Sequence, residues 1–447
     1  MLTTKKSIIV WGCLALVGAV FSSPIYAGET LTLMDCINHG LKHNPTVRGS
    51  AIRIEEAEDD IKTARADFLP SLTASYSLTN VGSIQSKGPT ETDYLDQINT
   101  YYSVGLSQIL YAGSGIYTNY KKAQADRDMK IATREMVELD LIYKIKTAFY
   151  QLLKARQDIA SITHTVERLE SGLTSAKAYF DQKMIPYVQV LQAELDLSGA
   201  QQSLSKTKNT VARVRSQLVS LLNLPHDEKY KFLDNLQPSD THVPESFDLA
   251  WQEAQKNRPD LRMLSFQKTI AQKEVIIAKS RYYPQVRMTA NYYDSDRDYD
   301  KLGVYTNGET YDRDQVNRYW TAGVTVSWNF FDGGRNYYKK NKFLKEIKWV
   351  DSKIDETVNS IKSRIQISFL ALKEAESRID FSNRAVKAAT EYYNREKKRL
   401  KARLTTMPAV LEAQAQLARA ESNYNQVLLD YSLALADLNY STGYREL

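Results

Sequence analysis

The chain has 447 residues, with 59 lysines and arginines against 53 aspartates and glutamates, for a formal net charge of +6. An excess this small, with basic and acidic residues interleaved along the predicted helices, excludes the electrostatic footprint of a nucleic-acid-binding protein. Two or three ordinary domains would fit this length, but an internal repeat overrides that expectation.

The N-terminus predicts an exported protein. A pair of lysines precedes an apolar run over residues 7–21, and Ala27 marks the expected cleavage position of a signal peptide over residues 1–27. Lipidation at Cys13 is an alternative way of processing the same segment. Cleavage after Ala27 would leave Cys36 as the single cysteine, which excludes an intrachain disulfide. No later stretch approaches the ~20 apolar residues that a transmembrane helix needs.

The mature chain begins with a helix followed by two strands. Helical periodicity runs from Thr30 to Asp67, is interrupted at Asn44-Pro45 and stops at Pro70. Apolar and polar residues then alternate over about 71–80 and again over about 101–111. Alternation of this kind predicts strands with one apolar and one polar face. We expect the polar residues between them to form a loop.

The longest pattern is a coiled-coil seam that runs from Ile145 to Leu221. Apolar residues recur there in steps of three and four. The seam is interrupted over residues 183–187, so its two halves must fold back on each other as a helical hairpin with its tip near Pro186. A first helix over 116–182 would be a rod of roughly 100 Å at 1.5 Å per residue.

The second half of the chain repeats this order. Arg258-Pro259 matches Asn44-Pro45, and the seam returns between Val410 and Leu438. Apolar residues between Ile347 and Leu372 recur every 11 residues, which predicts a nearly straight helix. The expected segments are a signal peptide at 1–27, a first repeat at 28–224 with its hairpin at 116–223, a linker at 225–245, and a second repeat at 246–447 with strands at about 285–293 and 319–331 and a hairpin at 335–443.

Four strands of about ten residues have the length of tilted transmembrane β-strands. The alternative is a small soluble sheet with one half-buried face. Aromatic residues flank the strands, as in the interfacial girdle of a membrane barrel: Tyr76, Tyr101, Tyr102, Tyr111, Tyr292, Tyr293, Trp320, Trp328 and Phe330. Open sheet edges are not tolerated in lipid and four strands cannot close a barrel, so several subunits would have to share one.

These features together resemble the outer-membrane efflux proteins, the TolC-like family. The resemblance spans nearly the whole mature chain and rests on the duplicated order of elements, on Asn44-Pro45 and Arg258-Pro259, on Phe68-Leu69-Pro70 and on the run 326–334. It implies a mainly α-helical protein with membrane β-strands. Three chains would form a 12-stranded β-barrel in the outer membrane above a periplasmic α-helical coiled-coil barrel.

The function that the resemblance implies is an exit duct for a tripartite efflux pump or for type I protein secretion. Its expected partners are two further copies of the chain, a periplasmic adaptor (membrane fusion) protein, an inner-membrane ABC or proton-driven transporter, and outer-membrane lipid. The rival function is a periplasmic coiled-coil adaptor or scaffold without a pore. An adaptor should carry one hairpin flanked by compact modules, whereas two hairpins alternate with long strands here.

The resemblance also implies two functional surfaces. The first is an adaptor-docking surface at the hairpin tips, comprising Lys183, Met184, Ile185, Pro186, Tyr187, Leu404, Thr405, Thr406, Met407 and Pro408. The second is a periplasmic gate, where Glu412 matches one acidic position of the family and Ala409 departs from the other. The first repeat supplies Gln189 and Gln192, and Lys401 and Arg403 are expected to tie neighbouring hairpins. The alternatives are that the tips are merely turns and that Glu412 is a solvated flank.

Competing chemical motifs are incomplete. His39 and His43 are four residues apart but lack the glutamate of a metalloprotease signature. The aspartates in 294–300 have calcium-loop spacing, yet Tyr299 replaces the required glycine and Tyr305 the final glutamate. We therefore expect solvent or core histidines and an acidic external loop. The sequence shows no nucleophile–base arrangement and no phosphate loop, so we expect neither an enzyme nor a resident cofactor.

Overall fold

The protein is described by a computed structural model that covers residues 30–88, 91–226, 230–233, 243–299, 303–304, 310–311 and 315–445. The expected signal peptide, the alternative lipidation site at Cys13 and most of the expected linker lie outside these residues. None of the helices within these ranges carries a stretch apolar enough to cross a bilayer.

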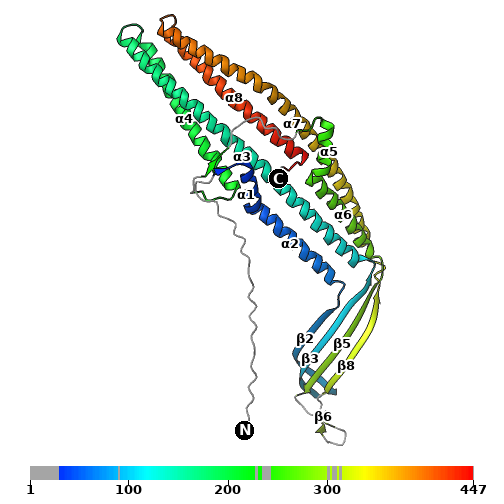
Figure 1. Ribbon diagram of the computed structural model, residues 1–447. Helices are drawn as coiled ribbons and strands as arrows, with labels where there is room; N and C mark the ends of the chain where they lie inside the picture. Colours follow the sequence, from blue (N-terminus) through cyan, green and yellow to red (C-terminus); the bar gives the residue numbers. More distant parts are fainter. Residues whose placement is uncertain are drawn as a thin grey trace, which may run out of the picture.

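Figure 1 shows an elongated molecule with paired helices at one end and a sheet at the other. The helices are α1 (Leu33–His43), α2 (Pro45–Ala66), α3 (Gly115–Asp181), α4 (Tyr187–Leu221), α5 (Phe247–Asn257), α6 (Pro259–Ser280), α7 (Arg335–Lys401) and α8 (Met407–Thr442). The strands are β1 (Thr30–Leu31), β2 (Ser71–Gly88), β3 (Glu91–Ala112), β4 (Lys231–Phe232), β5 (Gln285–Tyr299), β6 (Gly303–Val304), β7 (Thr310–Tyr311) and β8 (Gln315–Ser327).

The same succession of elements occurs twice. Helices α2 and α6 each have 22 residues, and both start with a proline, Pro45 in α2 and Pro259 in α6. Helices α3 and α7 each have 67 residues and start at Gly115 and Arg335. Because the paired helices have equal lengths, each residue of α2 has one counterpart in α6, and each residue of α3 has one counterpart in α7.

Each of the long helices α3 and α7 packs against two shorter helices that follow one another along its length. Helices α2 and α4 both pack along α3, and α6 and α8 both pack along α7. In the half next to the sheet the helices contact one another in the order α2, α3, α6, α7. In the tip half α3 packs against α4 and α8, and α8 packs against α7. The result is a wall of helices continued by the sheet (Figure 1).

The proline-marked interruptions are the joints of this wall. Asn44 caps α2 by accepting a hydrogen bond from the Thr46 amide at 2.8 Å, while its own amide donates to the Leu221 carbonyl at the end of α4, also at 2.8 Å. In the second repeat Arg258 donates to the Tyr440 carbonyl near the end of α8 at 2.9 Å. Each joint therefore donates a side-chain hydrogen bond to a carbonyl in the last turn of a neighbouring helix, where carbonyls lack the usual partner four residues on.

The core follows the predicted seams. Ile145, Leu152 and Leu218 are fully buried in the largest cluster, between α3 and α4. On α7 the 11-residue pattern supplies Val350 and Ile365, which are also fully buried. Apolar side chains at helical spacing lie on one face of each helix. Packing two such faces together removes them from water, which stabilises the pairing of the helices.

The four long strands form one antiparallel sheet in the order β2-β3-β5-β8. The expected loop between the first two strands is wrong, because Asn80 pairs with Ile98 and Gly82 with Asp96 in a continuous ladder. The expected acidic loop is likewise wrong over its first six residues, since β5 extends to Tyr299. Polar residues can continue a ladder whose pairing depends on backbone groups, and sequence alternation does not mark such an extension.

Strand β8 ends earlier than expected, at Ser327 rather than near residue 331. Its partner within the chain, β5, begins at Gln285, which pairs with Ser327. Residues 328–331 therefore have no partner strand in the described part of the chain. Strands β2 and β8 are the two edges of the sheet.

Candidate functional site

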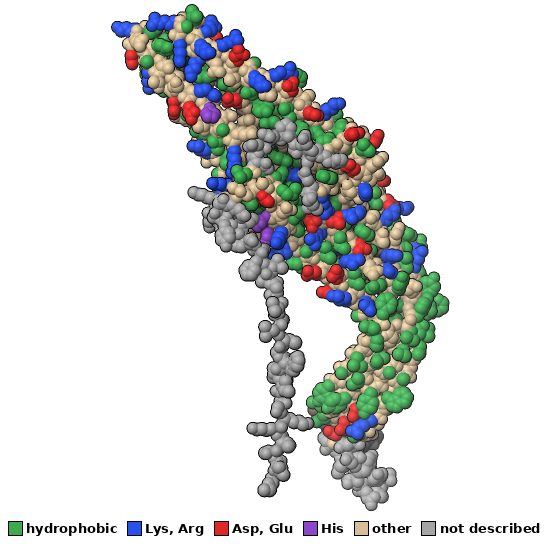
Figure 2. All heavy atoms as spheres, viewed as in Figure 1, with side chains coloured by type: hydrophobic (Ala, Val, Ile, Leu, Met, Phe, Trp, Pro, Cys, Tyr) green, Lys and Arg blue, Asp and Glu red, His purple; other side chains and the backbone are tan. Residues whose placement is uncertain are grey.

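The sheet has one apolar and one polar face. Ala74, Val104, Tyr292 and Trp320 lie opposite one another across the four strands and so share one face. The neighbouring row on the other face is Thr73, Gly105, Asn291 and Thr321. Trp320 is 75% exposed, and Figure 2 shows hydrophobic side chains gathered over the strands, with charged ones at the far end of the strands and over the helices.

The register divides the predicted aromatic girdle. Tyr76, Tyr102, Tyr111, Tyr292 and Trp320 lie on the apolar face. Successive residues of a strand point to opposite faces, so Tyr101 and Tyr293, which neighbour Tyr102 and Tyr292 in sequence, lie on the polar face.

There the rings of Tyr101 and Tyr293 lie 6.0 Å apart between centroids. The interpretation of these two tyrosines as girdle residues is therefore wrong. Trp328 and Phe330 follow the end of β8 and are both exposed, and Trp328 Nε1 donates to the Tyr282 carbonyl at 3.1 Å.

The two hairpin tips have the same backbone geometry. Lys183 and Arg403 both adopt a left-handed conformation, with φ of 58° and 60°. The amide of the next residue, Met184 or Leu404, donates back to a carbonyl five residues earlier, at 2.9 and 2.8 Å. This is the Schellman arrangement that ends a helix. The tips are thus fixed turns rather than loose loops.

A hydrogen-bonded cluster reinforces the second tip. Thr405 Oγ1 donates to Glu396 Oε2 at 2.8 Å, Arg399 pairs with Glu396 Oε1 at 2.7 Å, and Arg399 also donates to the Leu404 carbonyl at 3.1 Å. The hydrogen bond from Thr405 is the main reason why the pKa of Glu396 is lowered. Sequence reasoning missed this cluster, although a glutamate and a threonine on either side of a turn are a recognisable signal.

The tip residues predicted for adaptor docking divide by exposure. Met184, Tyr187 and Leu404 are exposed, and so are Lys183, Pro186, Thr406 and Pro408. Ile185 and Thr405 are half-buried. Met407 is 3% exposed and packs in a cluster with Leu169 and Leu411 that joins the two hairpins. Met407 therefore contributes to hairpin packing and is not part of the exposed tip surface.

A groove between the hairpins brings together the gate residues predicted from both repeats. It has a volume of about 870 Å³ and is lined by Gln189 and Gln192 of α4 and by Glu412 of α8. Glu412 is exposed and accepts a hydrogen bond from Gln416 at 3.1 Å. Lys401 and Arg403 are exposed but do not line this groove.

Two charged groove residues were missed by sequence reasoning, Asp196 and Arg419. Gln192 donates a hydrogen bond to Asp196 at 2.9 Å. Asp196 adds a second acidic group to the groove that Glu412 lines. The oxygen Oε1 of Gln189 is buried without a hydrogen-bond partner among the described residues. The spacing of Asp196 from Gln192, one helical turn, was the available signal.

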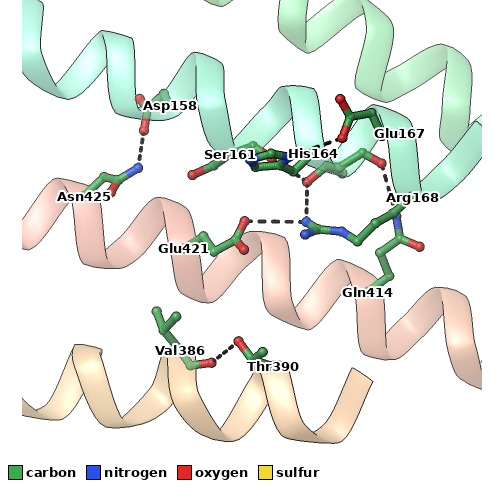
Figure 3. A network of polar contacts seen from close by, with 11 residues as sticks. Asp158, Ser161, His164, Glu167, Arg168, Val386, Thr390, Gln414, Glu421 and Asn425 are labelled. Carbon is green, nitrogen blue, oxygen red and sulfur yellow. Dashed lines mark hydrogen bonds and ion pairs between the residues drawn. The ribbon is translucent and has the colours of Figure 1, made fainter. Parts of the chain in front are cut away.

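Polar contacts connect the two hairpins above the groove, as Figure 3 shows for α3 and α8. Arg168 pairs with Glu421 at 3.5 Å, and Asn425 donates to Asp158 at 3.0 Å. Gln414 donates to the backbone carbonyl of Thr165 at 3.2 Å. These contacts cross between repeats, so they fix the position of one hairpin against the other.

Neither competing metal motif forms a metal site among the described residues. The described residues contain no group of three or more histidine, cysteine, aspartate or glutamate side chains placed to hold a metal ion. The rings of His39 and His43 stack at 4.3 Å between centroids. The pKa of His39 is lowered, chiefly by burial and next by the charge of the nearby His43. Asp294 lies in β5 and pairs with Arg318 of β8 at 3.1 Å.

A helical wall that continues into a two-faced sheet is the fold of outer-membrane channels. The chain aligns with the Campylobacter jejuni CmeC outer membrane channel at a TM-score of 0.75 and 15% identity, covering 92% of this chain and 85% of the other. It aligns with the outer membrane protein VceC of Vibrio cholerae at a TM-score of 0.74 and 15% identity, covering 92% and 97%.

The sequence supports the same assignment. The chain belongs to the outer membrane efflux protein family, whose model matches residues 36–224 and 250–444. It is similar to the outer membrane protein TolC of Vibrio cholerae serotype O1, with 20% identity over 441 residues, covering 94% of this chain and 92% of the relative. The expected family and outer-membrane location are thereby confirmed, with the helical part on the periplasmic side. These relatives are channel proteins, which points away from catalysis.

Proposed function

We propose that three copies of this chain form an exit duct through the outer membrane. The observation that carries the proposal is a four-stranded sheet with two open edges and one apolar face. Backbone groups at an edge must be paired in lipid. Three copies joined from β8 to β2 would close a barrel of 12 strands with the apolar face outward.

The polar face of the sheet would then line the lumen. Hydroxyl and amide side chains dominate that face, and Ser75 and Ser103 bond to each other across β2 and β3 at 2.7 Å. An interior of this kind holds water, as in channel-forming barrels. The helices continue the wall below the membrane as a coiled-coil barrel, because α3 and α7 run the whole length from sheet to tips.

The periplasmic entrance of the duct would be set by the groove between the hairpins. Glu412, brought together with Gln189 and Gln192, would be repeated around the three-fold axis. A ring of like carboxylates attracts cations and repels anions. We assign this ring as the gate and the interhairpin contacts of Arg168 and Asn425 as the links that hold its position.

The tips would dock a periplasmic adaptor that connects the duct to an inner-membrane transporter. The exposed tip side chains combine two cations, Lys183 and Arg403, with the apolar Met184, Tyr187 and Leu404. Such a mixture of apolar anchors and peripheral charge suits recognition of another helical hairpin. A tripartite efflux pump and a type I secretion system are the two assemblies that use such a duct.

Membrane fractionation tests this proposal. The mature protein should be found in the outer-membrane fraction and migrate as a heat-resistant trimer in mild detergent. The control is the same preparation heated until the trimer dissociates. A protein found in the soluble periplasmic fraction as a monomer would contradict the proposal and favour the adaptor function.

A further inference from the structure

Two helices form the lateral edges of the wall next to the sheet. Helix α2 packs on α3 and helix α7 packs on α6, while α3 and α6 pack on each other between them (Figure 1). The contact between α3 and α6 therefore joins the two repeats inside one chain. By the duplication, α3 corresponds to α7 and α6 corresponds to α2. The internal contact is thus a template for a contact between α7 of one copy and α2 of the next.

Two ion pairs hold the internal contact. Lys122 of α3 pairs with Glu274 of α6 at 2.8 Å, and their side chains are 31% and 24% exposed. Glu135 of α3 pairs with Arg262 of α6. The two pairs have opposite polarity, since the cation is on α3 in the first and on α6 in the second. The two ion pairs therefore attract the two helices to each other and also fix their register.

The duplication places the α3 members of both pairs on one lateral edge of the wall. When α3 and α7 are aligned from their first residues, Lys122 corresponds to Lys342 and Glu135 corresponds to Asp355. Both counterparts lie on α7, and both are exposed in the single chain. Each keeps the sign of charge that the template requires, so α7 presents a cation and an anion in the same order as α3.

The α6 members fall on the opposite edge in the same way. When α6 and α2 are aligned from their starting prolines, Glu274 corresponds to Asp60 and Arg262 corresponds to Arg48. Both counterparts lie on α2 and are exposed. The two edges therefore carry complementary charges at the positions where the template has its two ion pairs.

A glycine gives independent support for the same docking. Gly113 has φ of 58°, and a Cβ added to it would lie 2.6 Å from the Ser280 carbonyl oxygen at the end of α6. Its counterpart Gly333 has φ of 68°, yet an added Cβ there would meet no atom within 4 Å. The counterpart of Ser280 is Ala66, at the end of α2 on the opposite edge. The open space at Gly333 therefore corresponds to the position that α2 of a neighbouring copy would occupy.

We propose that α7 of one copy docks on α2 of the next through two ion pairs, Lys342 with Asp60 and Asp355 with Arg48. The proposal rests on the trimeric duct proposed above and names the surface through which its helical walls join. A register shifted by one turn toward the start of α2 would place Glu56 opposite Lys342 but Asn44 opposite Asp355. Only the unshifted register therefore keeps both ion pairs.

Charge reversal tests the pairing. Lys342→Glu and Asp60→Lys should each lower the temperature at which the trimer dissociates in detergent, because each places like charges at all three boundaries. The double variant carrying both changes should recover most of the loss. The matched control is Lys122→Glu with Glu274→Lys, whose pairing lies within one chain. Single reversals without effect, or a double variant no better than the singles, would overturn the proposal.

Crosslinking separates this proposal from the trimer itself. The variant with Lys342→Cys and Asp60→Cys, treated with a short bifunctional maleimide, should give covalent trimers that survive denaturation. The variant with Lys122→Cys and Glu274→Cys should react equally and stay at the mass of one chain. If the wild-type protein forms trimers but the first variant gives no covalent trimer, the pairing is wrong and the duct stands. If the wild-type protein forms no trimer, both proposals fail.

Discussion

A single carboxylate, Glu396, organises the second tip. It is buried, it binds Thr405 and Arg399, and its pKa is lowered chiefly by the Thr405 hydroxyl. A carboxyl group whose pKa is lowered on folding stabilises the fold when it is ionised. Its contribution is therefore full above the ordinary glutamate value of 4.5 and is lost as the pH falls through the lowered pKa.

We predict that Thr405→Val loosens this tip. The amides of residues 403–406 should exchange with deuterium faster at neutral pH, because Glu396 loses the hydroxyl that holds it. In the wild-type protein the same amides should lose protection as the pH falls below about 4.5, the ordinary glutamate value. The first tip, at residues 183–186, serves as the internal control. Unchanged exchange in the variant would show that backbone bonds alone fix the turn.

A second residue, Glu412, is predicted to set the ion selectivity of the entrance. Glu412→Gln should lower the preference for cations and weaken block by trivalent cations, because it removes one charge per copy from the groove. Single-channel recordings under a salt gradient measure both effects. Glu391→Gln, which removes an exposed carboxylate paired with Arg395 on α7, is the matched control. Equal selectivity and block in both variants would mean that Glu412 is not the gate.

Among the elements, the joints between stacked helices have a distinct role. Asn44 caps α2 and at the same time satisfies the Leu221 carbonyl of α4. We predict that Asn44→Ala lowers the free energy of unfolding by about 1–3 kcal/mol, the combined scale of a lost cap and an unpaired, partly buried carbonyl. Denaturant unfolding of the helical part measures it. Asn209→Ala, at an exposed position of α4, should change little, and equal losses in the two variants would contradict the role of the joint.

The tips are the elements predicted to meet the adaptor. Reversing both tip cations, with Lys183→Glu and Arg403→Glu, should weaken crosslinking to the adaptor several-fold while trimers and membrane insertion remain. Both residues are exposed and lie at the same place in equivalent turns. The variant with both residues changed to Gly is a useful comparison, since it removes the charges and suits a left-handed backbone. Full transport in the reversed variant would place docking elsewhere.

Sequence patterns predicted the helices better than the strands, for a physical reason. A long seam such as Ile145 to Leu221 repeats many times, so its helical period is unambiguous. The ends of β2 and β3 are polar and are held by backbone pairing, which leaves no alternation to read. Adjacent tyrosines such as Tyr101 and Tyr102 look alike in sequence, and only the register assigns them to opposite faces. The contact of Arg168 with Glu421 depends on how the two repeats meet, which no local pattern encodes.

At the scale of the whole molecule, a single chain leaves strand edges and edge helices uncovered among the described residues. Its sheet has two unpaired edges, its edge helices carry complementary charges, and residues 328–331 follow β8 without a partner strand among the described residues. Closure by further copies, as proposed, would pair both strand edges and bring the complementary charges together. A closed assembly would also separate the apolar face from the polar one, placing lipid outside and water inside.

The conductance of the purified mature protein in a planar lipid bilayer tests the proposed trimeric duct directly. We predict discrete steps of uniform size, each from the insertion of one trimer, and no steps from protein that has been heated until it dissociates. Purified trimers that insert into the bilayer without conducting ions would contradict the proposed duct, because the polar face of the sheet would then not line an open channel.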